Sequence, residues 1–133
     1  MSEPRTLSQA EYRRLSCAVL QILQAHRGAR AAITGVELAK MLGFRNDRLI
    51  RRAIQRMIEE DCVTIAASVH EPYGYYLIET KEEGDIYEAC LRSRAAKTLT
   101  RLSKFRRGMA AKFGPAYQMS LFYVDAALKE LRK

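Results

Sequence analysis

Apolar residues in the first part of the chain recur every three or four positions, which predicts amphipathic helices. The first helix is expected from about residue 8 to residue 25. Ser8 and Glu11 form a capping-box pattern at its start, and Gly28 is a suitable stop. His26 lies where an imidazole favours the negative end of the helix dipole. The buried stripe of this helix is expected to consist of Leu15, Ala18, Val19, Ile22 and Leu23.

Two more helices follow, separated by a short turn. One is predicted over residues 36–42, with Thr34 as a cap before it and Gly43 as a left-handed stop after it. The next helix should begin at Asn46, whose side chain suits an N-cap, with Asp47 at the positive end of the dipole. Its apolar stripe is expected to consist of Ile50, Ala53, Ile54, Met57 and Ile58.

The pattern then changes from a helical period to alternation. Residues 63–68 alternate as in a short strand, and residues 75–78 are rich in β-forming side chains. The segment VHEPYG between them contains proline and glycine, which favour a turn. This stretch therefore predicts a β-hairpin.

A long helix is predicted from Thr80 to about Arg107, because Thr80 and Glu83 repeat the capping-box pattern and no proline interrupts the segment. Its apolar positions alternate by four and three residues, the spacing found where one helix lies along another. This line consists of Leu91, Ala95, Thr98, Leu102, Phe105 and Met109.

A last amphipathic helix is expected to start at Pro115, after Gly114, and to reach the end of the chain. Its stripe can pack on the long helix of the same chain or on a second subunit. Self-association is the favoured alternative, since an apolar seam at the end of the chain suits a two-fold dimer. The predicted dimerisation residues are Tyr117, Leu121, Val124, Leu128 and Leu131.

These elements predict a mainly α protein with a small β-hairpin. We expect a polar tail over residues 1–7, a first domain over residues 8–79 and a helical extension over residues 80–133.

Arginine is concentrated on the third helix. Between residues 45 and 56 there are five arginines and one acid. At about 100° per residue, Arg48, Arg52 and Gln55 lie opposite the apolar stripe. Such a face suits a phosphate-lined groove, although arginines on a surface helix can also serve solubility alone.

The order of helix, turn, arginine-rich helix and hairpin resembles the winged helix-turn-helix family of bacterial and phage DNA-binding proteins. The resemblance covers about residues 15–78 and is carried by LGFRNDRLIRRAIQRMIEED followed by GYYLIET. It implies that residues 31–34 form a short strand beside the hairpin and that the third helix enters the major groove. It also implies that the hairpin is a wing. The wing carries His70 and Tyr73 as candidate phosphate donors but no lysine or arginine, and its Glu71 would repel phosphate.

The formal net charge of +8 and the pI of about 9.7 favour a polyanionic partner, most commonly nucleic acid and more rarely an anionic membrane surface. A second basic segment spans residues 92–112, with eight basic residues and no acid. The candidate DNA-binding residues are Arg45, Asn46, Arg48, Arg51, Arg52, Gln55, Arg56, His70, Tyr73, Arg94, Lys97, Arg101 and Lys104.

No segment has the apolar length of a membrane span, and the charged start does not fit a signal peptide, so a cytoplasmic, nucleoid-associated location is expected. Cys17, Cys62 and Cys90 are far apart and lie in apolar patterns, which predicts reduced core residues. The sequence contains no metal-ligand cluster, phosphate-binding loop or nucleophile motif, so no catalytic residue, metal or cofactor is expected.

These observations predict a non-enzymatic protein that binds double-stranded DNA, as a transcriptional regulator or a phage or plasmid replication accessory protein. An alternative from another class is a winged-helix module that binds an acidic partner protein. RNA stays open as a third ligand.

Overall fold

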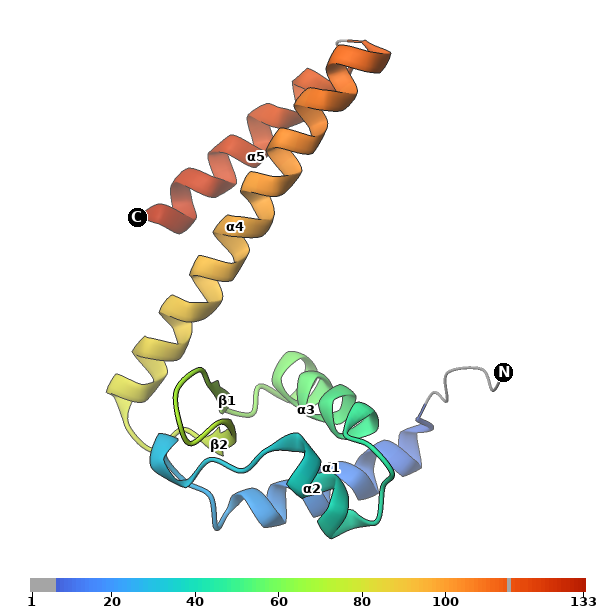
Figure 1. Ribbon diagram of the computed structural model, residues 1–133, viewed down its shortest axis with the longest axis vertical. Helices are drawn as coiled ribbons and strands as arrows, with labels where there is room; N and C mark the ends of the chain where they lie inside the picture. The colour runs from blue at the N-terminus through green and yellow to red at the C-terminus, as the bar shows by residue number, and fades with distance from the viewer. Residues whose placement is uncertain (1–6, 115) are drawn as a thin grey trace. The chain divides into compact units, whose positions relative to one another are not determined.

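The computed structural model describes residues 7–114 and 116–133, with the backbone alone for residues 116 and 118–122 (Figure 1). The protein is mainly helical with one small antiparallel hairpin, which confirms the predicted fold class. The chain forms two compact units, residues 1–84 and residues 85–133. The elements are α1 (Gln9–Leu23), the 3₁₀ helix η1 (Ala29–Ala31), α2 (Gly35–Leu42), α3 (Arg48–Asp61), β1 (Ile65–Ser68), β2 (Gly74–Leu77), α4 (Lys81–Phe113) and α5 (Ala116–Arg132).

Helix α1 begins as predicted but ends earlier than expected. The Ser8 hydroxyl accepts a hydrogen bond from the Glu11 backbone N–H at 3.2 Å. The helix stops at Leu23, so the prediction that Gly28 ends it is wrong; Gly28 instead precedes η1 with a φ of 84°. The expected capping role of His26 is also not observed, because its Nδ1 lies 2.7 Å from the Ala31 carbonyl oxygen and bridges to η1.

The caps of α2 follow the sequence, whereas the start of α3 is shifted by one residue. Thr34 Oγ1 accepts from the Glu37 N–H at 3.1 Å, and Gly43 ends α2 in the left-handed region with a φ of 78°. The N-cap of α3 is Asp47, which makes no side-chain capping bond. Asn46 lies one residue before this N-cap, so the prediction of Asn46 as the N-cap is wrong. Its side-chain oxygen accepts a hydrogen bond from the Arg48 N–H at 3.1 Å.

One hydrophobic core holds the first unit together. Helix α1 packs on α3, α2 and β2, and the predicted stripes of α1 and α3 supply its centre. Burial of each large aliphatic side chain contributes about 2 kcal/mol relative to exposure. The fully buried side chains include Val19, Leu23, Leu38, Ile50, Ile54, Met57 and Ile65.

The hairpin pairs β1 with β2 in the register Ile65↔Leu77 to Ser68↔Gly74. The strand expected over residues 31–34 is reduced to a single bridge, in which Ile33 and Tyr75 exchange backbone hydrogen bonds of 2.9 and 2.7 Å. Gly74 is required here, because a Cβ would lie 2.2 Å from the Ile33 carbonyl oxygen.

Helix α4 starts with the predicted capping box. Thr80 Oγ1 accepts from the Glu83 N–H at 3.2 Å, and Glu83 Oε1 accepts from the Thr80 N–H at 3.2 Å. The helix continues beyond the expected end to Phe113. A glycine inside a helix costs about 1 kcal/mol, so Gly108 alone does not break a segment otherwise rich in helix formers.

In the second unit, α5 returns antiparallel to α4 (Figure 1). The guanidinium of Arg92 donates to the Glu130 carbonyl oxygen at 3.0 Å, and the Arg106 guanidinium lies 5.2 Å from the centroid of the Tyr117 ring. Ser103 is buried on the same side of α4. The contact line therefore passes through Arg92, Ala96, Leu99, Ser103, Arg106 and Ala110, which are spaced by four and three residues.

This contact line differs from the predicted one. Leu91, Leu102 and Phe105 of the predicted line remain exposed. The observed line contains small residues, which let two helix backbones approach closely. The prediction of the packed face of α4 was therefore wrong for the contact with α5.

The apolar stripe of α5 is covered within the chain. Val124 and Leu128 are buried, and Tyr117 and Leu131 are half-buried. The side chain of Leu121 and the predicted helix start at Pro115 lie outside the described residues. This arrangement corresponds to the intramolecular alternative, and a dimer through this stripe would require the hairpin to open.

The three cysteines are free but do not lie in the core. Cys17 and Cys62 are exposed and Cys90 is half-buried. Cys17 is two positions from Leu15 and Val19, which places it on the opposite side of α1. Cys62 caps α3 in a left-handed conformation with a φ of 54°. The prediction of core cysteines is therefore wrong.

Candidate nucleic-acid interface

The arginine-rich side of α3 is exposed, and the opposite side of the helix is buried in the core. Ile50, Ala53, Ile54 and Met57 are buried against the core of the first unit, as predicted. Arg48, Arg52 and Gln55 are exposed on the other side. The sequence thus encodes a helix with one apolar and one cationic side, and the core fixes which side faces solvent.

One arginine just before α3 and the first residue of α3 are available to a ligand. Arg45 and Arg48 are exposed, and within the described part of the chain their guanidinium groups have no ion pair or hydrogen bond. Arg52 is also exposed, but it takes part in a further interaction within the chain. Asn46 is exposed and already accepts the Arg48 N–H, so its amide nitrogen is the group left to contact a phosphate.

Two further candidates are each paired with an acid four residues away along the chain. Arg51 Nε lies 2.9 Å from Asp47 Oδ2, and Gln55 Nε2 donates to Glu59 Oε1 at 3.1 Å. Exposed pairs of this kind contribute about 0–1 kcal/mol. A phosphate or a base edge can therefore replace either acid at little cost.

Arg56 is held by one contact within α3 and by two contacts that connect α3 to α1. Its Nε lies 2.8 Å from Glu60 Oε2, its Nη2 donates to Gln9 Oε1 at 2.6 Å, and its guanidinium stacks over Tyr12. These contacts engage the guanidinium of Arg56 within the first unit, whereas the sequence predicted it to be a phosphate contact.

Tyr12 is the residue that sequence reasoning missed. It is buried, and its hydroxyl donates to Asp61 Oδ2 at 2.8 Å. Burial raises the pKa of Tyr12, and the hydrogen bond to Asp61 adds to this, while Ser16 and Arg56 lower it. The signal in the sequence was its position three residues before Leu15, which extends the apolar stripe of α1.

The hairpin tip has little positive charge. His70 and Tyr73 are exposed, as a phosphate contact requires. However, Tyr73 lines a groove together with Glu37 and Glu71. These carboxylates repel phosphate, so the geometry favours α3 over the hairpin as the contact surface.

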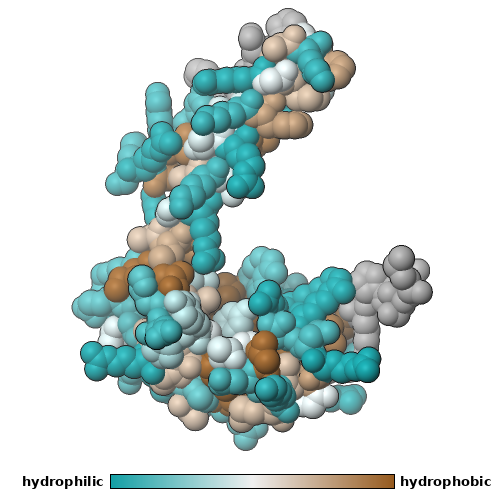
Figure 2. Space-filling model, in the orientation of Figure 1, coloured by the Kyte–Doolittle hydropathy of each residue, from teal (hydrophilic) through white to brown (hydrophobic). Residues whose placement is uncertain are grey.

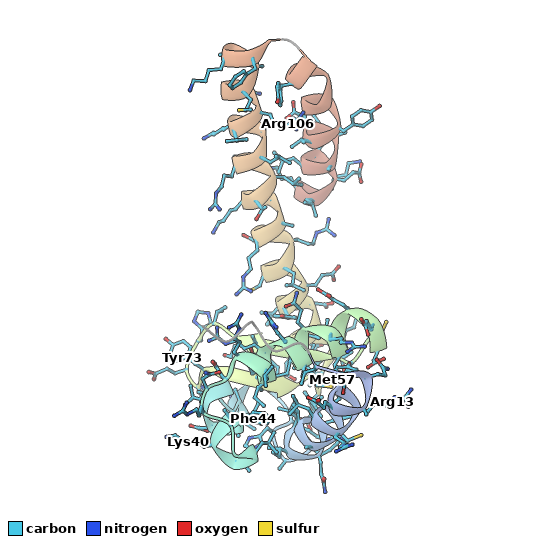
Figure 3. The ribbon with its side chains drawn as sticks, turned by 90° about the vertical axis from the view of Figure 1, so that its right-hand side faces the viewer. Arg13, Lys40, Phe44, Met57, Tyr73 and Arg106 are labelled. Carbon is cyan, nitrogen blue, oxygen red and sulfur yellow. The ribbon has the colours of Figure 1, made fainter. Side chains whose placement is uncertain are left out.

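The second unit carries a separate basic surface. Arg94, Lys97, Arg101 and Lys104 are exposed, and in the described residues their side chains have no ion pair. Arg92 differs, because it lies 3.9 Å from Glu88 and donates to Glu130. Hydrophilic side chains project along α4 in Figure 2, and nitrogen-tipped side chains leave α4 on the side away from α5 in Figure 3. We call Arg94, Lys97, Arg101 and Lys104 the basic stripe.

The described residues contain no group of three or more histidine, cysteine or acidic side chains that could hold a metal ion. None of the helices over residues 7–114 and 116–133 combines the length and apolar content needed to cross a bilayer. No protein-family model, curated protein or solved structure matches the chain.

Proposed function

We propose that this protein binds double-stranded DNA without catalysing a reaction, as a winged helix-turn-helix protein whose α3 enters the major groove. The observation that carries the proposal is the exposed arginine side of α3, whose opposite side is locked into the core. Arg48 and Arg52 would form bidentate contacts with guanine, and Gln55 would contact adenine. Arg45, Asn46 and Arg51 would contact phosphates.

The basic stripe on α4 would add affinity without sequence information, because lysine and arginine on a smooth helix face contact the phosphate backbone. The net charge of +8 supports such a partner. A regulator of transcription or a replication accessory protein of a phage or plasmid is the biological setting that we propose, with a nucleoid-associated location.

Selection of bound sequences from a random duplex pool, followed by anisotropy titration at several salt concentrations, tests this proposal. We expect Arg48→Ala to cost about 1–3 kcal/mol on the selected site and to relax base preference at one position. Arg13→Ala is the matched control, since Arg13 is an exposed arginine on α1. Absence of duplex binding at low salt, or equal losses for both variants, contradicts the proposal.

A second candidate function is binding of an acidic protein. Val36 and Met41 on α2 are exposed, and exposed aliphatic side chains serve as anchors in protein interfaces. A complex with an acidic protein that loses affinity on Met41→Ser and on Arg48→Ala, while no duplex DNA is bound at low salt, would favour this function over DNA binding.

A further inference from the structure

Helix α4 carries an apolar line that its own hairpin leaves open. Leu91, Leu102 and Phe105 are 44%, 39% and 64% exposed. They continue the four-three spacing through Ala95, Thr98 and Met109. A regular line of this kind is typical of a helix that packs along another helix. In the described residues, α5 covers a different side of α4.

Helix α5 extends this surface on the same side of the hairpin. Leu102 is turned by about 100° from the buried Ser103, and Tyr123 is turned by about 100° in the same sense from the buried Val124. In an antiparallel pair of right-handed helices, equal turns in the same sense bring both residues to one side. Tyr123 is 77% exposed, and Ala127 beside it is exposed as well.

The hairpin therefore has one apolar face that is two helices wide. Figure 2 shows apolar atoms reaching the surface toward the end of α4. We define the apolar face by its members, which are Leu91, Ala95, Leu102, Phe105, Met109, Tyr123 and Ala127.

The extent of this face fits a protein interface. With about 200 Å² for a fully exposed aromatic side chain, the face exposes roughly 500 Å² of side-chain area. A standard interface buries about 800 Å² per partner, and the aliphatic stems of flanking arginines and lysines can supply the remainder. The largest contiguous apolar patch on a monomer is commonly about 300–600 Å² and is often functional, and this face lies in that range.

Charge selects the orientation in which two copies of this chain can pair. Residues 92–112 of α4 contain eight basic residues and no acid, so two copies of α4 laid side by side would repel each other. In contrast, Asp125 is the one charged residue between residues 116 and 128 of α5. Placing α4 of one copy against α5 of the other avoids this repulsion and brings each basic helix beside a nearly uncharged one.

We propose that the apolar face binds a second copy of this chain, with α4 of each copy against α5 of the other in a four-helix bundle. Each copy keeps Val124 and Leu128 buried in its own hairpin, so this dimer differs from one that forms through the α5 stripe. The basic stripe lies beside the apolar face and stays accessible to solvent. The proposal uses no residue of the first unit and does not depend on DNA binding.

Sedimentation equilibrium of the full chain without DNA tests the proposal, with twice the chain mass of 15.2 kDa expected at micromolar concentration. We expect Phe105→Glu to raise the dimer dissociation constant by about 30-fold or more, the loss typical of a central interface anchor. Because Phe105 is exposed in the monomer, circular dichroism should show an unchanged helix content. Ile86→Glu is the matched control, since Ile86 is 65% exposed on another side of α4.

A monomeric wild-type chain overturns the proposal, as does equal dissociation of the two variants or an undiminished dimer of Phe105→Glu. The orientation is tested by thiol cross-linking in a background with Cys17, Cys62 and Cys90 changed to serine. The contacts Arg92–Glu130 and Arg106–Tyr117 place Ala95 of α4 level with Ala127 of α5. A mixture of Ala95→Cys and Ala127→Cys chains should therefore cross-link between the two variants. Efficient cross-linking of Ala95→Cys to itself instead rejects the α4–α5 arrangement.

Discussion

The guanidinium of Arg56 lies over the ring of Tyr12, with Cζ 3.9 Å from the ring centroid. Arg56 is thus an arginine of α3 whose guanidinium is engaged by other side chains of the first unit. A cation–π contact of this kind contributes about 0.5–2 kcal/mol. The hydrogen bond to Gln9 adds to the connection between α3 and α1, and the hydrogen bond to Glu60 within α3 holds the guanidinium in place.

We therefore predict that Arg56→Ala lowers the free energy of unfolding by about 1–2 kcal/mol. Arg48→Ala should leave stability within about 0.5 kcal/mol, because Arg48 is an exposed residue without such contacts. Urea denaturation of both variants measures the difference. Equal stability of the two variants would show that the Tyr12 contact contributes nothing in solution.

Glu83 gives the first unit a defined dependence on pH. Its carboxylate accepts hydrogen bonds from the backbone N–H groups of Ala29, Glu79 and Thr80, and these bonds lower its pKa below the ordinary value of 4.5. A lowered pKa in the folded state means that the stabilisation is fully present above pH 4.5 and is lost as the pH falls through the lowered pKa.

Glu83→Gln should accordingly reduce stability by about 1 kcal/mol at pH 7, because a charged acceptor is replaced by a neutral one. The difference between Glu83→Gln and the wild type should shrink as the pH falls below 4.5 and through the lowered pKa of Glu83, where the wild-type carboxylate becomes protonated. Denaturation curves between pH 3 and 7 measure this. A difference that stays constant across this range would contradict the assigned role.

Two glycines with positive φ differ in whether there is space for a Cβ atom. Comparing them therefore separates the cost of backbone strain from the cost of steric overlap. Gly74 has a φ of 125°, and a Cβ there would meet the Ile33 carbonyl oxygen at 2.2 Å. Gly43 has a φ of 78°, but a Cβ there would have nothing within 4 Å. We predict that Gly74→Ala costs about 3 kcal/mol or more, and that the control Gly43→Ala costs about 1 kcal/mol. Thermal unfolding would contradict this account if the two substitutions had equal effects.

The sequence was sufficient to predict features that depend only on residues close together along the chain. The buried stripe of α3, the Thr34 cap and the Thr80–Glu83 box were all predictable, since helical period and capping are local. The side of α4 that contacts α5 was not, because it depends on how closely two backbones approach.

The engagement of Arg56 also depends on tertiary structure. Gln9 and Tyr12 are more than forty positions from Arg56 along the chain, and no local pattern brings them together. The sequence thus predicted a charged helix face, but it did not predict which of its arginines are engaged within the fold and which are available to a ligand. In physical terms, periodicity assigns a side chain to one side of a helix, and tertiary packing decides what that side chain meets.

The basic stripe allows the electrostatic part of the proposed DNA binding to be measured apart from base recognition. Each phosphate contact contributes about 0.9 to the slope of log affinity against log salt concentration. Changing Arg94, Lys97, Arg101 and Lys104 to glutamine together should therefore reduce the slope by up to about 3.6 and weaken binding to all duplex sequences alike. Changing Arg92 and Arg106 to glutamine is the control, since both contact α5. An unchanged slope in the stripe variant would mean that α4 stays away from the phosphates, and the affinity would then come from the arginines of α3.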